Sequence, residues 1–96
     1  MDIQSILTEI ERDEHAFAQK HGGSSASLER LSVVNYAATG SGGTLVLIGL
    51  FSNPDELIVL KNHKGDLREH LGKHVVVIRD DVGFAVRLFG LVGKTN

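Results

Sequence analysis

The chain has no cysteine and a single proline among its 96 residues. Without cysteine it can form neither a disulfide framework nor a thiolate metal site. It also has no apolar run near the roughly 18 residues that a membrane-spanning helix needs. The first residues, Met-Asp-Ile-Gln, show neither the basic start nor the apolar core of a secretory signal peptide. We therefore expect a cytoplasmic protein that makes no contact with a membrane.

Positive charge is scarce as well. Ten lysines and arginines stand against 12 aspartates and glutamates, which gives a net charge of −2. A protein that holds nucleic acid mainly by neutralising phosphates needs clustered lysine and arginine. The composition therefore argues against a strongly electrostatic nucleic-acid binder.

The length and the 42% hydrophobic content predict one folded domain over residues 1–96. Within it, the pattern divides the chain into three parts. We expect a helix over 2–21, a small-residue linker over 22–27, and a β-barrel or bent sheet over 28–92. The predicted fold class is thus mainly β with an N-terminal α-helix.

The helix prediction depends on apolar residues that recur at three- and four-residue spacing. Asp2 is the expected N-cap, and Gly22-Gly23 is the expected stop. The stripe has to be covered by something. It either packs on the chain's own sheet or forms a helix–helix oligomer contact. The residues of this candidate oligomer face are Ile3, Ile6, Leu7, Ile10 and Phe17.

Five β-strands are predicted from β-branched and apolar runs. Residues 54–64 are ambiguous, because Asn53-Pro54 suits either a turn or a helix start. We favour a strand there, since 57–60 lacks helical spacing. A short helix over 66–71 is expected between strands three and four. The predicted strands are 28–38, 44–51, 57–60, 74–79 and 84–92.

One phrase of the sequence resembles a known fold. Leu71-Gly72-Lys73-His74-Val75-Val76-Val77, followed by 83–88, is similar to the passage from the helix into strand four of OB domains. The order strand, strand, strand, short helix, strand, strand also resembles that family. The resemblance implies a small five-stranded barrel, while the alternative is a strongly bent antiparallel sheet. OB domains often stack bases on aromatics of strands two and three, where this chain has only Phe51.

Patterns typical of catalysis are not present. The run Gly40-Ser41-Gly42-Gly43 lacks the lysine of a phosphate-binding loop. The adjacent acids Asp80-Asp81 are better explained by a turn. His70 and His74 stand four apart, but Gly72 should end any helix between them, which weakens a shared metal site. We expect a protein that is not an enzyme and needs neither metal nor cofactor.

The remaining candidate site is a partner or nucleic-acid face with basic and aromatic side chains. Arg79 and Arg87 fall on neighbouring predicted strands, and Phe89 shares a side with Arg87. Basic and aromatic groups together are what single-strand binding uses. The residues of this face are Lys61, Arg79, Arg87 and Phe89.

Apolar residues occupy both sides of the strands 44–51, 57–60 and 84–92. One helix cannot cover all the outward-facing groups, and monomers rarely expose large apolar patches. We therefore predict a homo-oligomer, a dimer above all. The expected function is a non-catalytic interaction or assembly module that binds a protein partner or itself. The alternatives are a single-stranded nucleic-acid binder and a structural adaptor of a larger particle.

Overall fold

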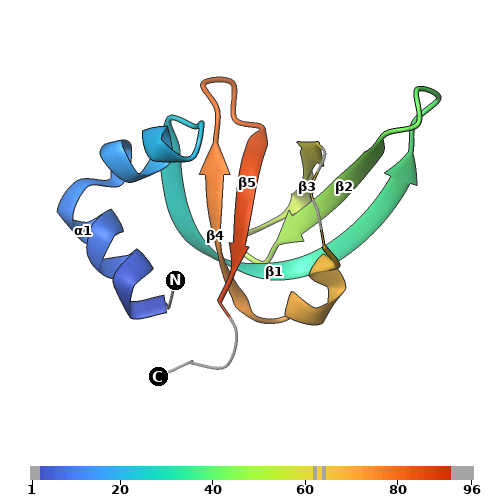
Figure 1. The fold of residues 1–96 in the computed structure, drawn as a ribbon. Helices are drawn as coiled ribbons and strands as arrows, with labels where there is room; N and C mark the ends of the chain where they lie inside the picture. Colours follow the sequence, from blue (N-terminus) through green and yellow to red (C-terminus); the bar gives the residue numbers. More distant parts are fainter. Residues whose placement is uncertain (1–2, 62, 64, 92–96) are drawn as a thin grey trace.

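The computed structural model describes residues 3–61, 63 and 65–91 (Figure 1). The chain is mainly β, with one α-helix at its start. Asp2, the expected helix cap, and residue 92, the expected end of the sheet, lie outside the described residues. The elements are α1 (Ile3–Lys20), β1 (Ser25–Ala38), β2 (Thr44–Leu50), β3 (Asn53–Lys61), the 3-10 helix η1 (Leu67–His70), β4 (His74–Arg79) and β5 (Ala85–Gly90).

The five strands close on themselves in the order β1-β2-β3-β5-β4. All neighbours are antiparallel except β3 and β5, which run parallel and pair where Leu60 meets Ala85. The expected alternative of a bent, wholly antiparallel sheet is therefore wrong. Closure depends on β1, because its first half pairs with β4 and its second half with β2. An irregularity between Leu31 and Val33 marks the change of partner, and Figure 1 shows the strand curving there.

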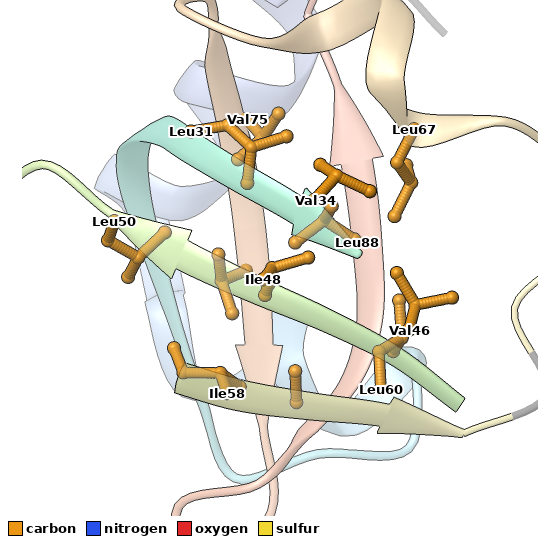
Figure 2. Close-up of a cluster of buried hydrophobic side chains, with 12 residues drawn as sticks. Leu31, Val34, Val46, Ile48, Leu50, Ile58, Leu60, Leu67, Val75 and Leu88 are labelled. Atoms are coloured by element: carbon orange, nitrogen blue, oxygen red, sulfur yellow. The ribbon is translucent and has the colours of Figure 1, made fainter. Parts of the chain in front are cut away.

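Apolar side chains fill the interior of the closed sheet. Figure 2 shows them converging from all the strands, with Leu67 reaching in from η1. Each such side chain contributes roughly 1.5–3 kcal/mol when it is removed from water. The interior cluster consists of Leu31, Val34, Val46, Ile48, Leu50, Ile58, Leu60, Leu67, Val75, Val77, Ala85 and Leu88.

A second apolar cluster lies outside the sheet, beneath α1. Val76 and Ile78 of β4 point into it, while Val75 and Val77 point into the interior, and all four are 0% exposed. Strand β4 is therefore buried on both faces. The cluster consists of Ile6, Phe17, Ala18, Ala26, Val76, Ile78 and Leu91, with Ile10 and Phe89 at its margin.

The helix and the linker differ from their predictions. Asp13 has non-helical angles (φ −162°, ψ 90°) and kinks α1 into two segments. Its carboxylate accepts a hydrogen bond from Ala16 N at 3.1 Å, as an N-cap of the second segment would. The expected linker over 22–27 is wrong in its second half, because β1 begins at Ser25 and pairs there with Arg79.

Residues 53–61 form β3, so the helical interpretation of this segment is wrong. Between β3 and β4, where a short helix was expected, the chain makes a single 3-10 turn, and the α-helix of the described residues stands before β1. Asp66 caps η1 by accepting a hydrogen bond from Arg68 N at 2.9 Å. In the described part of the chain, no helix has both the length and the apolarity to cross a bilayer.

Gly23 allows α1 to approach the end of β4, which yields a stability prediction. A Cβ at Gly23 would lie 2.6 Å from Arg79 O and would collide with Ile78 Cγ2. Gly23→Ala should therefore lower the free energy of unfolding by about 1–3 kcal/mol. Urea denaturation would measure this. Gly40→Ala is the matched control, because a Cβ there meets nothing within 4 Å, and it should change stability by less than about 0.5 kcal/mol. Equal effects of the two variants would contradict the close approach.

The surroundings of His21 lead us to expect that the docking of α1 depends on pH. Its ring packs between Phe17 and Phe89, with centroids 4.8 and 4.9 Å away, and its buried Nε2 has no hydrogen-bond partner among the described residues. Burial lowers the pKa of His21 below 6.5, and the positive charges of Arg87 and Lys20 lower it further.

Because the unfolded chain protonates His21 at a higher pH than the folded chain does, stability should fall as pH drops below about 6.5. His63, whose pKa burial also lowers, adds to the same slope. His21→Phe keeps a ring in place and should reduce the loss of stability between about pH 7 and about pH 5. Denaturation at a series of pH values measures the slope, and an unchanged slope would contradict a role for His21.

Candidate interaction site

A long stretch of the chain carries no charge. From Leu31 to Pro54 there is no aspartate, glutamate, lysine or arginine. This stretch contains the second half of β1, all of β2 and the start of β3. We call residues 31–50 the neutral arm. In Figure 1 its hairpin extends away from α1, at the upper right. Charged groups are depleted in the cores of protein interfaces, so this composition directs attention to the arm.

The outer face of the neutral arm is apolar and uncovered. Val33 of β1 and Leu57 of β3 are 39% and 52% exposed, and Gly49 lies between them in the sheet. An added Cβ at Gly49 would come within 3.4 Å of Val33 Cβ and 3.5 Å of Leu57 Cδ2. The glycine therefore lets the two flanking side chains form one continuous apolar surface.

This surface continues onto β5 across the parallel pair. A pocket of about 260 Å³ lies there, with Lys61 and Asp80 as its charged lining residues. Phe84 at its wall is 54% exposed. The other lining residues are Val59, Ala85 and Val86.

The second half of β1 has one edge that pairs with no described strand, and η1 packs beside this edge. β2 pairs with β1 over 31–38, whereas β4 pairs only with 25–30. Thr39 N donates to Gly43 O on the β2 side at 2.9 Å. Because the direction of backbone groups alternates along a strand, the N–H and C=O groups of Val34, Tyr36 and Ala38 point away from β2. They form a row along the edge that no described strand pairs with.

The side chain of Tyr36 braces the arm against η1. Its hydroxyl donates to Asp66 Oδ1 at 3.2 Å and accepts from Leu67 N at 2.7 Å. Arg68 binds both oxygens of Asp66 and holds the pKa of that carboxyl at about 2. The bracing is therefore intact at any pH near neutrality.

A polar pocket of about 260 Å³ lies at one end of the closed sheet. Arg79 and Glu29 are 23% and 17% exposed, and Arg79 Nη2 lies 3.8 Å from Glu29 Oε2. Arg79 Nη1 donates to Ser27 Oγ, and Ser52 Oγ donates to Glu29 Oε1 at 2.9 Å. These polar side chains hydrogen-bond to one another, and they lie over the apolar side chain of Leu50, which also lines the pocket.

The four residues of the predicted basic and aromatic face are not all brought together. Arg87 and Phe89 are, with the guanidinium 5.9 Å from the ring centre, although Phe89 also packs at the margin of the cluster under α1. Arg79 lines the polar pocket instead. Arg87 pairs with Ile78, so the alternation of side chains along β4 places Arg79, the next residue, on the opposite face. Lys61 is exposed on the apolar outer surface.

The predicted oligomer face is largely used within the chain. Ile6 and Phe17 are buried against the sheet, and Ile10 packs partly buried beside them. Leu7 is half-buried. The side chain of Ile3 lies outside the described residues. The apolar stripe of α1 therefore packs on the chain's own sheet, which was one of the two expected alternatives, the other being a helix–helix oligomer contact.

The histidine pair is also separated. The ring of His70 is nearly buried and packs against Gly90, where an added Cβ would collide with it, while His74 is exposed. Over the ranges that the structure describes, no three histidine or acidic side chains gather as a metal site. The turn prediction holds for Asp80, which accepts hydrogen bonds from Val82 N and Phe84 N at 3.0 Å each.

Two arginine–aromatic contacts were not foreseen. Arg30 lies 4.6 Å from the centre of the Phe51 ring, and Arg68 lies 5.1 Å from that of Tyr36. Each pair joins residues far apart in sequence. Only the pairing of β1 with the turn after β2, and the position of η1, bring them together, so no local pattern could have revealed them.

Comparisons with protein families, with curated proteins and with solved structures find no match for this chain.

Proposed function

We propose that this protein is a non-catalytic interaction module that binds another protein surface through the outer face of its neutral arm. The observation that carries the proposal is the exposed pair Val33 and Leu57. The two side chains flank Gly49 on the outer face, where Val33 and Gly49 belong to the stretch without charge. An apolar surface that continues to Phe84 is what a binding site exposes and what an isolated protein normally covers. The same face would serve a structural adaptor of a larger particle.

The absence of catalysis in this proposal has its own support. The polar side chains of the pocket around Arg79 hydrogen-bond to one another, so each already has a partner within the chain. The finer fold assignment is also part of the proposal. The closed order β1-β2-β3-β5-β4, with η1 between β3 and β4, is similar to that of an OB barrel. Since unrelated functions share such folds, the surface and not the fold has to carry the function.

A photo-crosslinking amino acid at position 57 would test the proposal in cells. If the face binds protein, p-benzoylphenylalanine in place of Leu57 should give covalent adducts with polypeptide. The same residue at Glu11, exposed on α1, is the matched control and should give few. Protease digestion followed by mass spectrometry identifies the adducts. Equal labelling from both positions, or none from position 57, would contradict the proposal.

A second candidate is single-stranded nucleic-acid binding, which the arginine–aromatic contacts favour. Phe51 is exposed beside Arg30, and exposed aromatics next to arginine stack bases. Arg87 beside Phe89 offers a similar pair on another part of the sheet.

The two pairs can be tested separately with a fluorescently labelled single strand at low salt. If this candidate is right, anisotropy should rise on binding, and Phe51→Ala should weaken binding by roughly 1–3 kcal/mol. Arg87→Ala tests the second pair, and Gln19→Ala on α1 is the control. No anisotropy change with the unsubstituted protein would exclude this function.

A further inference from the structure

From the pocket between β3 and β5, we infer that the protein partner binds with its own carboxyl terminus. The pocket takes the partner's last side chain, which is apolar, and Lys61 binds the terminal carboxylate. The inference rests on the proposed function, because it states the chemistry of the protein that this outer face binds. The residues that line the pocket are Val59, Lys61, Asp80, Phe84, Ala85 and Val86.

The pocket has the size and the lining for one apolar side chain. Its volume is about 260 Å³, below the roughly 300–1,000 Å³ of sites that enclose a whole small ligand. Four of its six lining residues are apolar. Among the described residues, β3 and β5 pair only where Leu60 meets Ala85, and the pocket lies beside this short contact. It therefore suits one part of a larger partner.

Two charged groups at the pocket leave a donor and an acceptor unused. Lys61 and Asp80 form no ion pair with each other, and the ammonium of Lys61 has no partner among the described residues. Asp80 Oδ1 accepts from Val82 N and Phe84 N, which leaves Oδ2 without a donor in the described part of the chain. The last residue of a peptide carries a carboxylate for the ammonium and a backbone N–H for the carboxylate oxygen, so it complements both.

The outer face of β3 provides the path along which the partner lies. Ile58 and Leu60 are buried inside the sheet, so Leu57, Val59 and Lys61 face outward. These three side chains, two apolar and then one basic, span about 13 Å at roughly 3.3 Å per residue. An extended peptide on this path covers Leu57 and Val59 and ends at Lys61. A free amino acid, which has the same terminal charge, would leave Leu57 uncovered.

Random peptides with a free C-terminal carboxylate test this chemistry without knowledge of the partner. The immobilised protein should retain peptides that end in leucine, isoleucine, valine, methionine or phenylalanine, and mass spectrometry of the eluted peptides would identify them. The same pool with C-terminal carboxamides should be retained about tenfold less, since a carboxamide lacks the charge that Lys61 binds.

One retained peptide, synthesised with a fluorescent label, then serves as the probe for variants. Lys61→Gln should weaken its binding about tenfold, to the level of its carboxamide form. Lys73→Gln is the matched control, because it makes the same charge change outside the pocket, and it should leave binding unchanged. Both lysines are exposed, so neither variant should disturb folding. Fluorescence anisotropy measures each affinity.

Equal retention of the two pools, a random last residue among the retained peptides, or no retained peptide would each overturn the inference. So would a Lys61→Gln variant that binds the probe as well as the unsubstituted protein does. Free leucine should compete with the probe at least about tenfold less well than the unlabelled peptide, because it cannot cover Leu57. Equal potency would identify a site for a free amino acid instead. If position 57 still crosslinks to protein while these tests fail, only the choice of the carboxyl terminus is wrong.

Discussion

Strand β4 lies between the two apolar clusters and contributes side chains to both. Val75 and Val77 close the interior, Val76 and Ile78 carry α1, and none of the four is exposed. A strand buried on both faces reads as a continuous apolar run. Loss of one side chain would open a cavity in one cluster and disturb the strand on which the other depends. The position of α1, the closure of the sheet and the course of β1 all follow from this strand.

The position of α1 decides which surface remains free. By covering β4 and the parts of β1 and β5 beside it, the helix buries Ala26 and Leu91 and covers part of Phe89. It cannot also cover the second half of β1, β2 and β3, because these lie beyond the bend of β1. Val33 and Leu57 are therefore exposed. The neutral composition of residues 31–54 and the lack of cover over Val33 and Leu57 are independent observations, and both agree with an interface.

Sequence reasoning succeeded where the signal was local. Four consecutive β-branched residues, Val75 to Ile78, identify β4 without any tertiary information. It failed where the pairing with another strand decided the secondary structure, or where the alternation of side chains decided the face on which a residue lies. Ser25-Ala26-Ser27 resembles a linker and becomes a strand only because β4 pairs with it. Arg79 was grouped with Arg87 because the composition does not show that Arg87 pairs with Ile78, the pairing that puts Arg79 on the opposite face. The change of partner along β1 was equally hidden, since only the tertiary fold decides where its pairing with β4 stops.

The two edges of the sheet provide the final argument about the neutral arm. If the neutral arm lacked charge only because this chain does little to prevent aggregation, the start of β3 would be expected to lack charge as well. Instead, Pro54, Asp55 and Glu56 come directly after the uncharged stretch and stand where β3 is exposed. The chain thus uses charge and proline at one exposed strand and omits them at the other. The contrast between the two strands agrees with the proposal that the outer face of the neutral arm is an interaction surface.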